Sequence, residues 1–68
     1  MYIVLEIQKT GEQIALLSWT FTDVQQANAQ YHTVLAAAAM SSVPLHAASM
    51  LDERGNTIKS ENYVHDVK

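Results

Sequence analysis

Three histidines, His32, His46 and His65, are the residues of this chain best suited to metal binding or proton transfer near neutral pH. His46 opens one strand-like segment and His65 closes the next, so antiparallel pairing of these segments would bring the two histidines close together. One interpretation is a metal or proton-transfer pair, and the other is two strand-end histidines with no common task. We favour the second, because no two histidines have a metal-ligand spacing, and we predict no metal site.

Other catalytic residue types are present without the context that their chemistry needs. The serines at positions 18, 41, 42, 49 and 60 lie outside any nucleophile-elbow pattern. Gly11 and Gly55 are isolated, so they cannot form a phosphate-binding loop. The sequence therefore predicts no catalytic residue and no cofactor site, and we expect a protein that is not an enzyme.

Aromatic residues are concentrated near the start of the chain. On a strand hairpin they could stack nucleotide bases, but such platforms lie among basic residues, whereas here only Lys9 is basic and the formal net charge is -3. This argues against a nucleic-acid partner, and a nucleic-acid-associated accessory protein remains the alternative. Because Trp and Tyr often anchor protein interfaces, we predict a protein contact on one sheet face through Tyr2, Val4, Leu17, Trp19 and Phe21.

The elements that position these residues begin with a hairpin. Residues 2–9 alternate in the manner of a strand, a turn is expected at Thr10-Gly11, and residues 13–21 form the second strand. A loop of these two residues sets Lys9 opposite Glu12 and Leu5 opposite Leu16. Both faces of the hairpin are then apolar, one of them aliphatic and the other aromatic.

A helix is predicted over residues 23–40. Thr22 followed by Gln25 has the spacing of a capping box. The inner apolar stripe consists of Val24, Ala27, Tyr31, Val34, Leu35 and Ala38. The outer face is small and uncharged, and it is a second candidate interface through Ala29, Thr33, Ala36, Ala37 and Met40.

Two more strands follow the helix, at residues 45–51 and 57–64, joined by a turn that needs Gly55 in the left-handed conformation. The order ββαββ predicts a single two-layer α+β domain over residues 1–68, in which one helix packs on one face of a four-stranded, mainly antiparallel sheet. We expect the strand order 2-1-3-4.

The length and the charge pattern predict self-association. A chain of 68 residues with no cysteine has only a thin core and no disulfide, and small domains of this kind often gain stability by oligomerising. Between Gln13 and Leu51 the only charged residue is Asp23, and interface cores are depleted in charge. We therefore predict a non-catalytic homodimeric interaction module, with another protein as a further partner left open.

The chain is expected to be cytoplasmic, with no membrane partner. It starts with a strand-like run and without the basic segment of a secretory leader. Its longest apolar run, residues 34–40, is far shorter than the ~20 residues that span a bilayer. The absence of cysteine agrees with a reducing compartment.

The segments YHTVLAAAA, VPLHAA, DERGN and ENYVH give the chain a resemblance to a family of small bacterial proteins. These proteins are of similar size, many belong to phage-related or other mobile elements, and they resemble this chain over nearly its whole length in their ββαββ pattern. The resemblance implies a fold and a mobile-element origin. It implies no activity and no catalytic residue.

Overall fold

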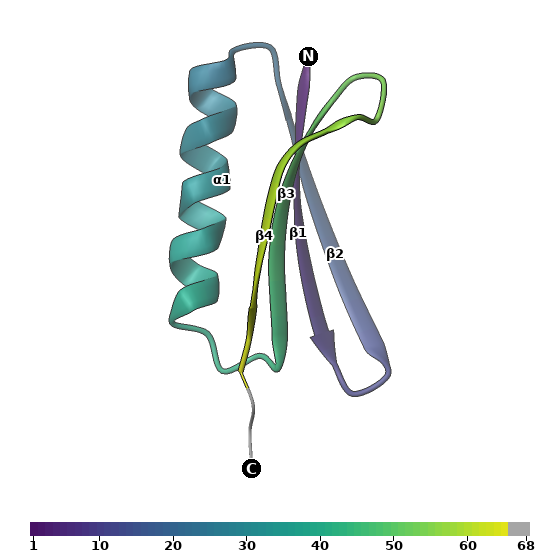
Figure 1. Ribbon diagram of the computed structural model, residues 1–68, viewed down its shortest axis with the longest axis vertical. Helices are drawn as coiled ribbons and strands as arrows, with labels where there is room; N and C mark the ends of the chain where they lie inside the picture. The colour runs from purple at the N-terminus through teal and green to yellow at the C-terminus, as the bar shows by residue number, and fades with distance from the viewer. Residues whose placement is uncertain (66–68) are drawn as a thin grey trace.

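The computed structural model describes residues 1–65 and contains one helix packed on one face of a sheet (Figure 1). The sheet has four antiparallel strands in the order β2-β1-β3-β4. This confirms the predicted α+β architecture and strand order. The predicted ends differ from the observed ones by at most one residue, and the elements are β1 (Tyr2–Thr10), β2 (Gln13–Phe21), α1 (Val24–Ala39), β3 (Leu45–Asp52) and β4 (Thr57–Val64).

The first hairpin has a different register from the one predicted. Its two-residue loop is Gly11-Glu12, so Thr10 lies opposite Gln13 and Lys9 lies opposite Ile14, not Glu12. Gly11 has φ +62°, which suits the first loop position of a II′ turn. Because the slip is two residues along the partner strand, every side chain stays on its predicted face.

The helix begins one residue later than the capping-box pattern suggested. Asp23 is the N-cap, and its side chain accepts a hydrogen bond from Gln25 N at 2.9 Å. The inner stripe is buried as predicted at Ala27, Tyr31, Val34, Leu35 and Ala38, whereas Val24 is 43% exposed. The helix ends at Ala39, where the amides of Met40 and Ser41 bond back to the carbonyls of Ala37 and Ala38.

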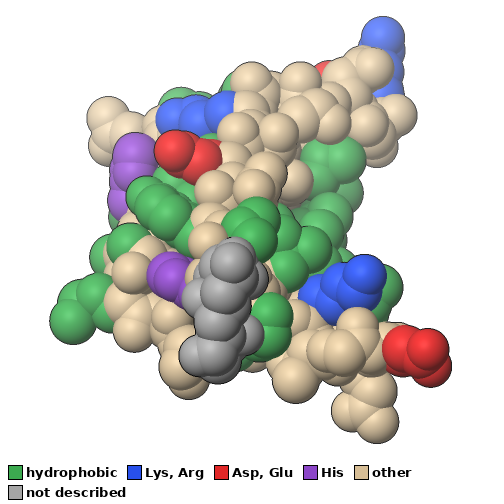
Figure 2. Space-filling model, turned by 60° about the horizontal axis from the view of Figure 1, so that its bottom comes forward, with side chains coloured by type: hydrophobic (Ala, Val, Ile, Leu, Met, Phe, Trp, Pro, Cys, Tyr) green, Lys and Arg blue, Asp and Glu red, His purple; other side chains and the backbone are tan. Residues whose placement is uncertain are grey.

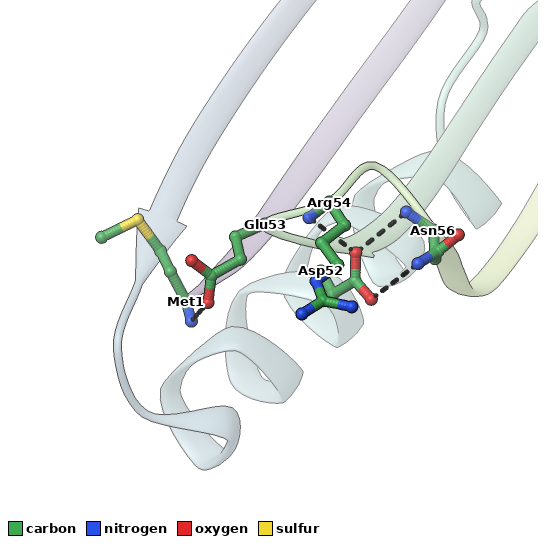
Figure 3. A network of polar contacts seen from close by, with 5 residues as sticks. All are labelled: Met1, Asp52, Glu53, Arg54 and Asn56. Carbon is green, nitrogen blue, oxygen red and sulfur yellow. Dashed lines mark hydrogen bonds and ion pairs between the residues drawn. The ribbon is translucent and has the colours of Figure 1, made fainter.

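The second hairpin is closed by hydrogen bonds to Asp52 (Figure 3). One carboxylate oxygen accepts from the amides of Arg54 and Asn56, both at 2.9 Å, and the other accepts from the Asn56 side chain at 3.2 Å. Gly55 has φ +86°, and its amide donates to the Asp52 carbonyl at 3.0 Å. This confirms the predicted turn with a left-handed glycine.

The core lies between α1 and the two central strands, with β4 and β2 contributing less. Met50 and Val4 are its largest fully buried side chains. Four of the inner helix residues, Ala27, Tyr31, Val34 and Leu35, pack on them together with Ala48. The core is thus thin, as the chain length implied.

Candidate functional site

The structure corrects the predicted sheet interface, because α1 covers the aromatic face and leaves the aliphatic face open. Val4 is completely buried. The rings of Tyr2, Trp19 and Phe21 lie on the same face of the sheet as Val4 and pack against the core. The three rings are half-buried against the core, so they do not form an open stacking platform of the kind that single-strand binders use. Leu17 is the exception among the predicted residues: it lies on the same face but remains 51% exposed.

We call the open side of the sheet the aliphatic face. It is formed by the odd-numbered residues of β1 and β3 and the even-numbered residues of β2. On β4 it includes the residues that pair with the odd-numbered residues of β3. In Figure 2 a run of hydrophobic side chains lies on the right, the side away from α1 in Figure 1. Within the strands Lys9, at one end, is the only charged residue on this face, and the larger apolar side chains are Ile3, Leu5, Ile7, Ile14, Leu16, Leu45, Leu51 and Val64.

The outer face of α1 lies where the sequence predicted. Ala29, Thr33, Ala36, Ala37 and Met40 are all exposed. The Thr33 hydroxyl donates to the Ala29 carbonyl at 2.8 Å, so its polar group is already satisfied within the helix. This surface offers a partner little more than methyl groups and one long side chain.

Beneath the helix, the structure reveals a polar pair that the sequence did not predict. Glu6 of β1 and His46 of β3 are both buried, and Glu6 Oε2 lies 2.6 Å from His46 Nε2. A single proton between these two atoms makes the contact a hydrogen bond. The other ring nitrogen, Nδ1, is buried without a hydrogen-bond partner. The pair therefore links the two central strands within the core.

The other two histidines have separate surroundings. His65 Nε2 lies 2.8 Å from the Ala38 carbonyl oxygen at the end of α1, and its ring stacks on Tyr63. His32 is exposed and meets the ring of Tyr31 edge-on. His46 and His65 thus serve different contacts, one in the core and one at the helix end. In residues 1–65, no three His, Cys, Asp or Glu side chains are placed to hold a metal ion.

Two groups have shifted pKa values with clear causes. Burial raises the pKa of the Tyr31 phenol, and the negative charge of Glu61 and the nearby Tyr63 add to the rise. The Lys59 ammonium lies 5.3 Å from the centre of the Tyr31 ring. Hydrogen bonds from Asn56, with smaller contributions from Arg54 and Gly55, lower the pKa of the Asp52 carboxyl. Both shifts arise from contacts that shape the fold.

The accessible surface of the described residues and the buried polar pair lie apart in this fold. No pocket opens among the residues that the structure describes, and small-molecule sites are normally concave. Glu6 and His46 have the residue types of an acid–base pair, but the helix and sheet enclose them. The large accessible feature is the aliphatic face.

No family model matches the chain, and neither a curated protein nor a solved structure is significantly similar to it. The resemblance to mobile-element proteins therefore stays a prediction. Within residues 1–65, no helix is long and apolar enough to cross a membrane.

Proposed function

We propose that the protein is a non-catalytic interaction module that forms a homodimer through its aliphatic face. The single observation that carries this proposal is an open sheet face whose strands bear apolar and neutral side chains and one terminal charge, Lys9. The solvated face of an antiparallel sheet normally carries polar residues, which alternate along each strand with the apolar residues of the buried face. Large exposed apolar patches mark contact sites. We also place the protein in the cytoplasm, which agrees with its lack of cysteine.

A second copy of the chain fits this face for two reasons. The face has a single charge, at one end, so the centre of a twofold contact is free of charge, and such isologous contacts are the commonest in homodimers. Two sheets can also pack face to face with their side chains interdigitating, as in a sandwich. Leu5 lies opposite Ser18 on one side and Ser49 on the other. Its side chain therefore stands between small neighbours and is available to a partner.

Dimerisation would also compensate for the thin core. A chain of this length gains only ~3–5 kcal/mol from a single core, and a face-to-face contact would give the sheet a second apolar layer. The helix outer face is the weaker candidate, because its alanines present little area. We therefore assign the dimer contact to the sheet.

Sedimentation equilibrium at low micromolar concentration tests the proposal with matched variants. The wild type should sediment at twice the chain mass of 7.5 kDa. Leu5→Lys should sediment as a monomer, because it sets two charges into an apolar contact. Ala37→Lys adds the same charge to the exposed outer face of α1 and should remain a dimer.

Circular dichroism must show that each variant keeps the wild-type secondary structure. A monomeric wild type would overturn the homodimer. A folded Leu5→Lys that stays dimeric, or dissociation by Ala37→Lys alone, would overturn the assignment to the aliphatic face.

A further inference from the structure

The two edges of the sheet are unlike, and the difference concerns β2. Each edge strand leaves a row of backbone amides and carbonyls unpaired, and proteins usually protect such edges with charges, prolines or bulges. β4 has this protection, since it carries Lys59 and Glu61 and its pairing with β3 is irregular at Met50/Leu51. β2 has none of it: QIALLSWTF has no charge and no proline, and it pairs with β1 without a register shift.

The side chains of β2 are unusually exposed for their type. Ile14 is 65% exposed, Leu16 61% and Leu17 51%. Ile14 and Leu16 point to the aliphatic face, whereas Leu17 points to the side of the sheet that α1 covers. A partner that packs flat on the aliphatic face cannot cover Leu17. A strand lying alongside β2 contacts both faces at once.

The helix leaves this edge accessible. α1 packs mainly against β3 and β1 and makes its fewest contacts with β2. In Figure 1, β2 lies on the side of the sheet away from α1 and β4. Nothing in residues 1–65 therefore lies against the outer side of β2.

We propose that β2 pairs edge to edge with β2 of a further copy, in antiparallel orientation, so that two sheets join into one continuous sheet. The sequence of β2 suits pairing with itself. The register in which every residue from Gln13 to Phe21 has a partner is centred on Leu17, so Leu17 lies opposite the partner's Leu17. Leu16 then lies opposite Ser18 and Ala15 opposite Trp19, so at both of these positions a large side chain lies beside a small one. No charges meet.

This contact is additional to the face-to-face dimer and uses a different surface. Two isologous contacts whose twofold axes intersect at right angles generate a closed tetramer. The edge contact buries a single strand on each side, so we expect it to be the weaker of the two. The protein should be a dimer at low micromolar concentration and a tetramer at high concentration.

Sedimentation velocity over a concentration series, with Leu17→Lys and Leu17→Gln, tests the edge contact. Leu17→Lys sets two like charges opposite each other at the centre of the pairing and should stop assembly at the dimer. Leu17→Gln has a similar size without the charge, so it keeps the backbone pairing and should still form the tetramer. Leu17 is half-exposed, and circular dichroism verifies that both variants fold.

Amide hydrogen exchange provides a second readout on the wild type. The β2 amides that do not bond to β1 should become protected as concentration rises, while the outward amides of β4 should not. The inference is overturned if Leu17→Lys assembles like the wild type, or if the outward β2 amides stay as unprotected as those of β4. Its failure is distinct from that of the face contact, which Leu5→Lys reports.

Discussion

Replacing His46 with leucine should destabilise the protein by about 3–5 kcal/mol, because it leaves the Glu6 carboxylate buried without its partner. The side chains of His46 and Glu6 are 4% and 11% exposed, and their atoms approach to 2.6 Å. Solvent therefore cannot replace the lost hydrogen bond. A loss of this size equals the ~3–5 kcal/mol that a core of this length supplies, so the variant should be largely unfolded at room temperature.

The opposite single change should be less damaging. Glu6→Leu leaves the buried His46 ring without its hydrogen-bond partner, which costs about 1–3 kcal/mol. Glu6→Gln keeps an acceptor at the same place and serves as the conservative control. The double variant Glu6→Leu/His46→Leu removes both polar groups and should be within about 1 kcal/mol of the wild type, or more stable than it.

Urea unfolding followed by circular dichroism measures the three variants that stay folded, and for His46→Leu the folded fraction without urea gives the free energy. The subunit concentration must be held constant, because the stability of a dimer depends on it. The coupling free energy, which is the double-variant cost minus the two single costs, should be negative by several kcal/mol. Additive costs, or a His46→Leu variant as stable as the wild type, would refute the assignment of the pair to a buried, mutually dependent contact.

Three further perturbations test the core and the two shifted pKa values. Leu35→Ala should lower the free energy of unfolding by about 2–5 kcal/mol through a core cavity, as measured by urea unfolding. The lowered pKa of Asp52 stabilises the fold above the ordinary pKa of an aspartate, and this contribution is lost as pH falls through the folded-state value. Asp52→Ala should therefore flatten thermal stability against pH below about pH 4. The raised pKa of Tyr31 favours the folded state fully below about pH 10 and is lost as pH rises through the folded-state value. Tyr31→Phe should flatten the decline in thermal stability at alkaline pH, and an unchanged decline would contradict that origin.

The elements and their order were predictable because each leaves a local signal. Alternation identified the strands, Gly55 identified the second turn, and the apolar period identified the helix. The register of the first hairpin was not fixed by such signals. Thr10-Gly11 and Gly11-Glu12 both offer a glycine turn, and the two choices keep every side chain on the same face.

The face covered by the helix could not be predicted from alternation, because both faces of the first hairpin are apolar. The choice depends on contacts between distant segments. Helix residues pack on Val4 and Met50, and β1 and β3 bring together Glu6 and His46, 40 positions apart. Glu6 was itself a signal of unusual surroundings, since it is the one charged residue on its face of β1 and follows the apolar Tyr2 and Val4 there. Its partner depends on the register between β1 and β3, which no turn sets.

The assignment of the dimer to the aliphatic face is tested most directly by isotope-filtered NMR on a mixture of labelled and unlabelled chains. The proposal predicts intermolecular contacts among the methyl groups of Ile3, Leu5, Ile7 and Leu51, which lie on that face. Intermolecular contacts confined to Ala37 and Met40 of the helix, or none at a concentration where the protein is dimeric by sedimentation, would contradict it.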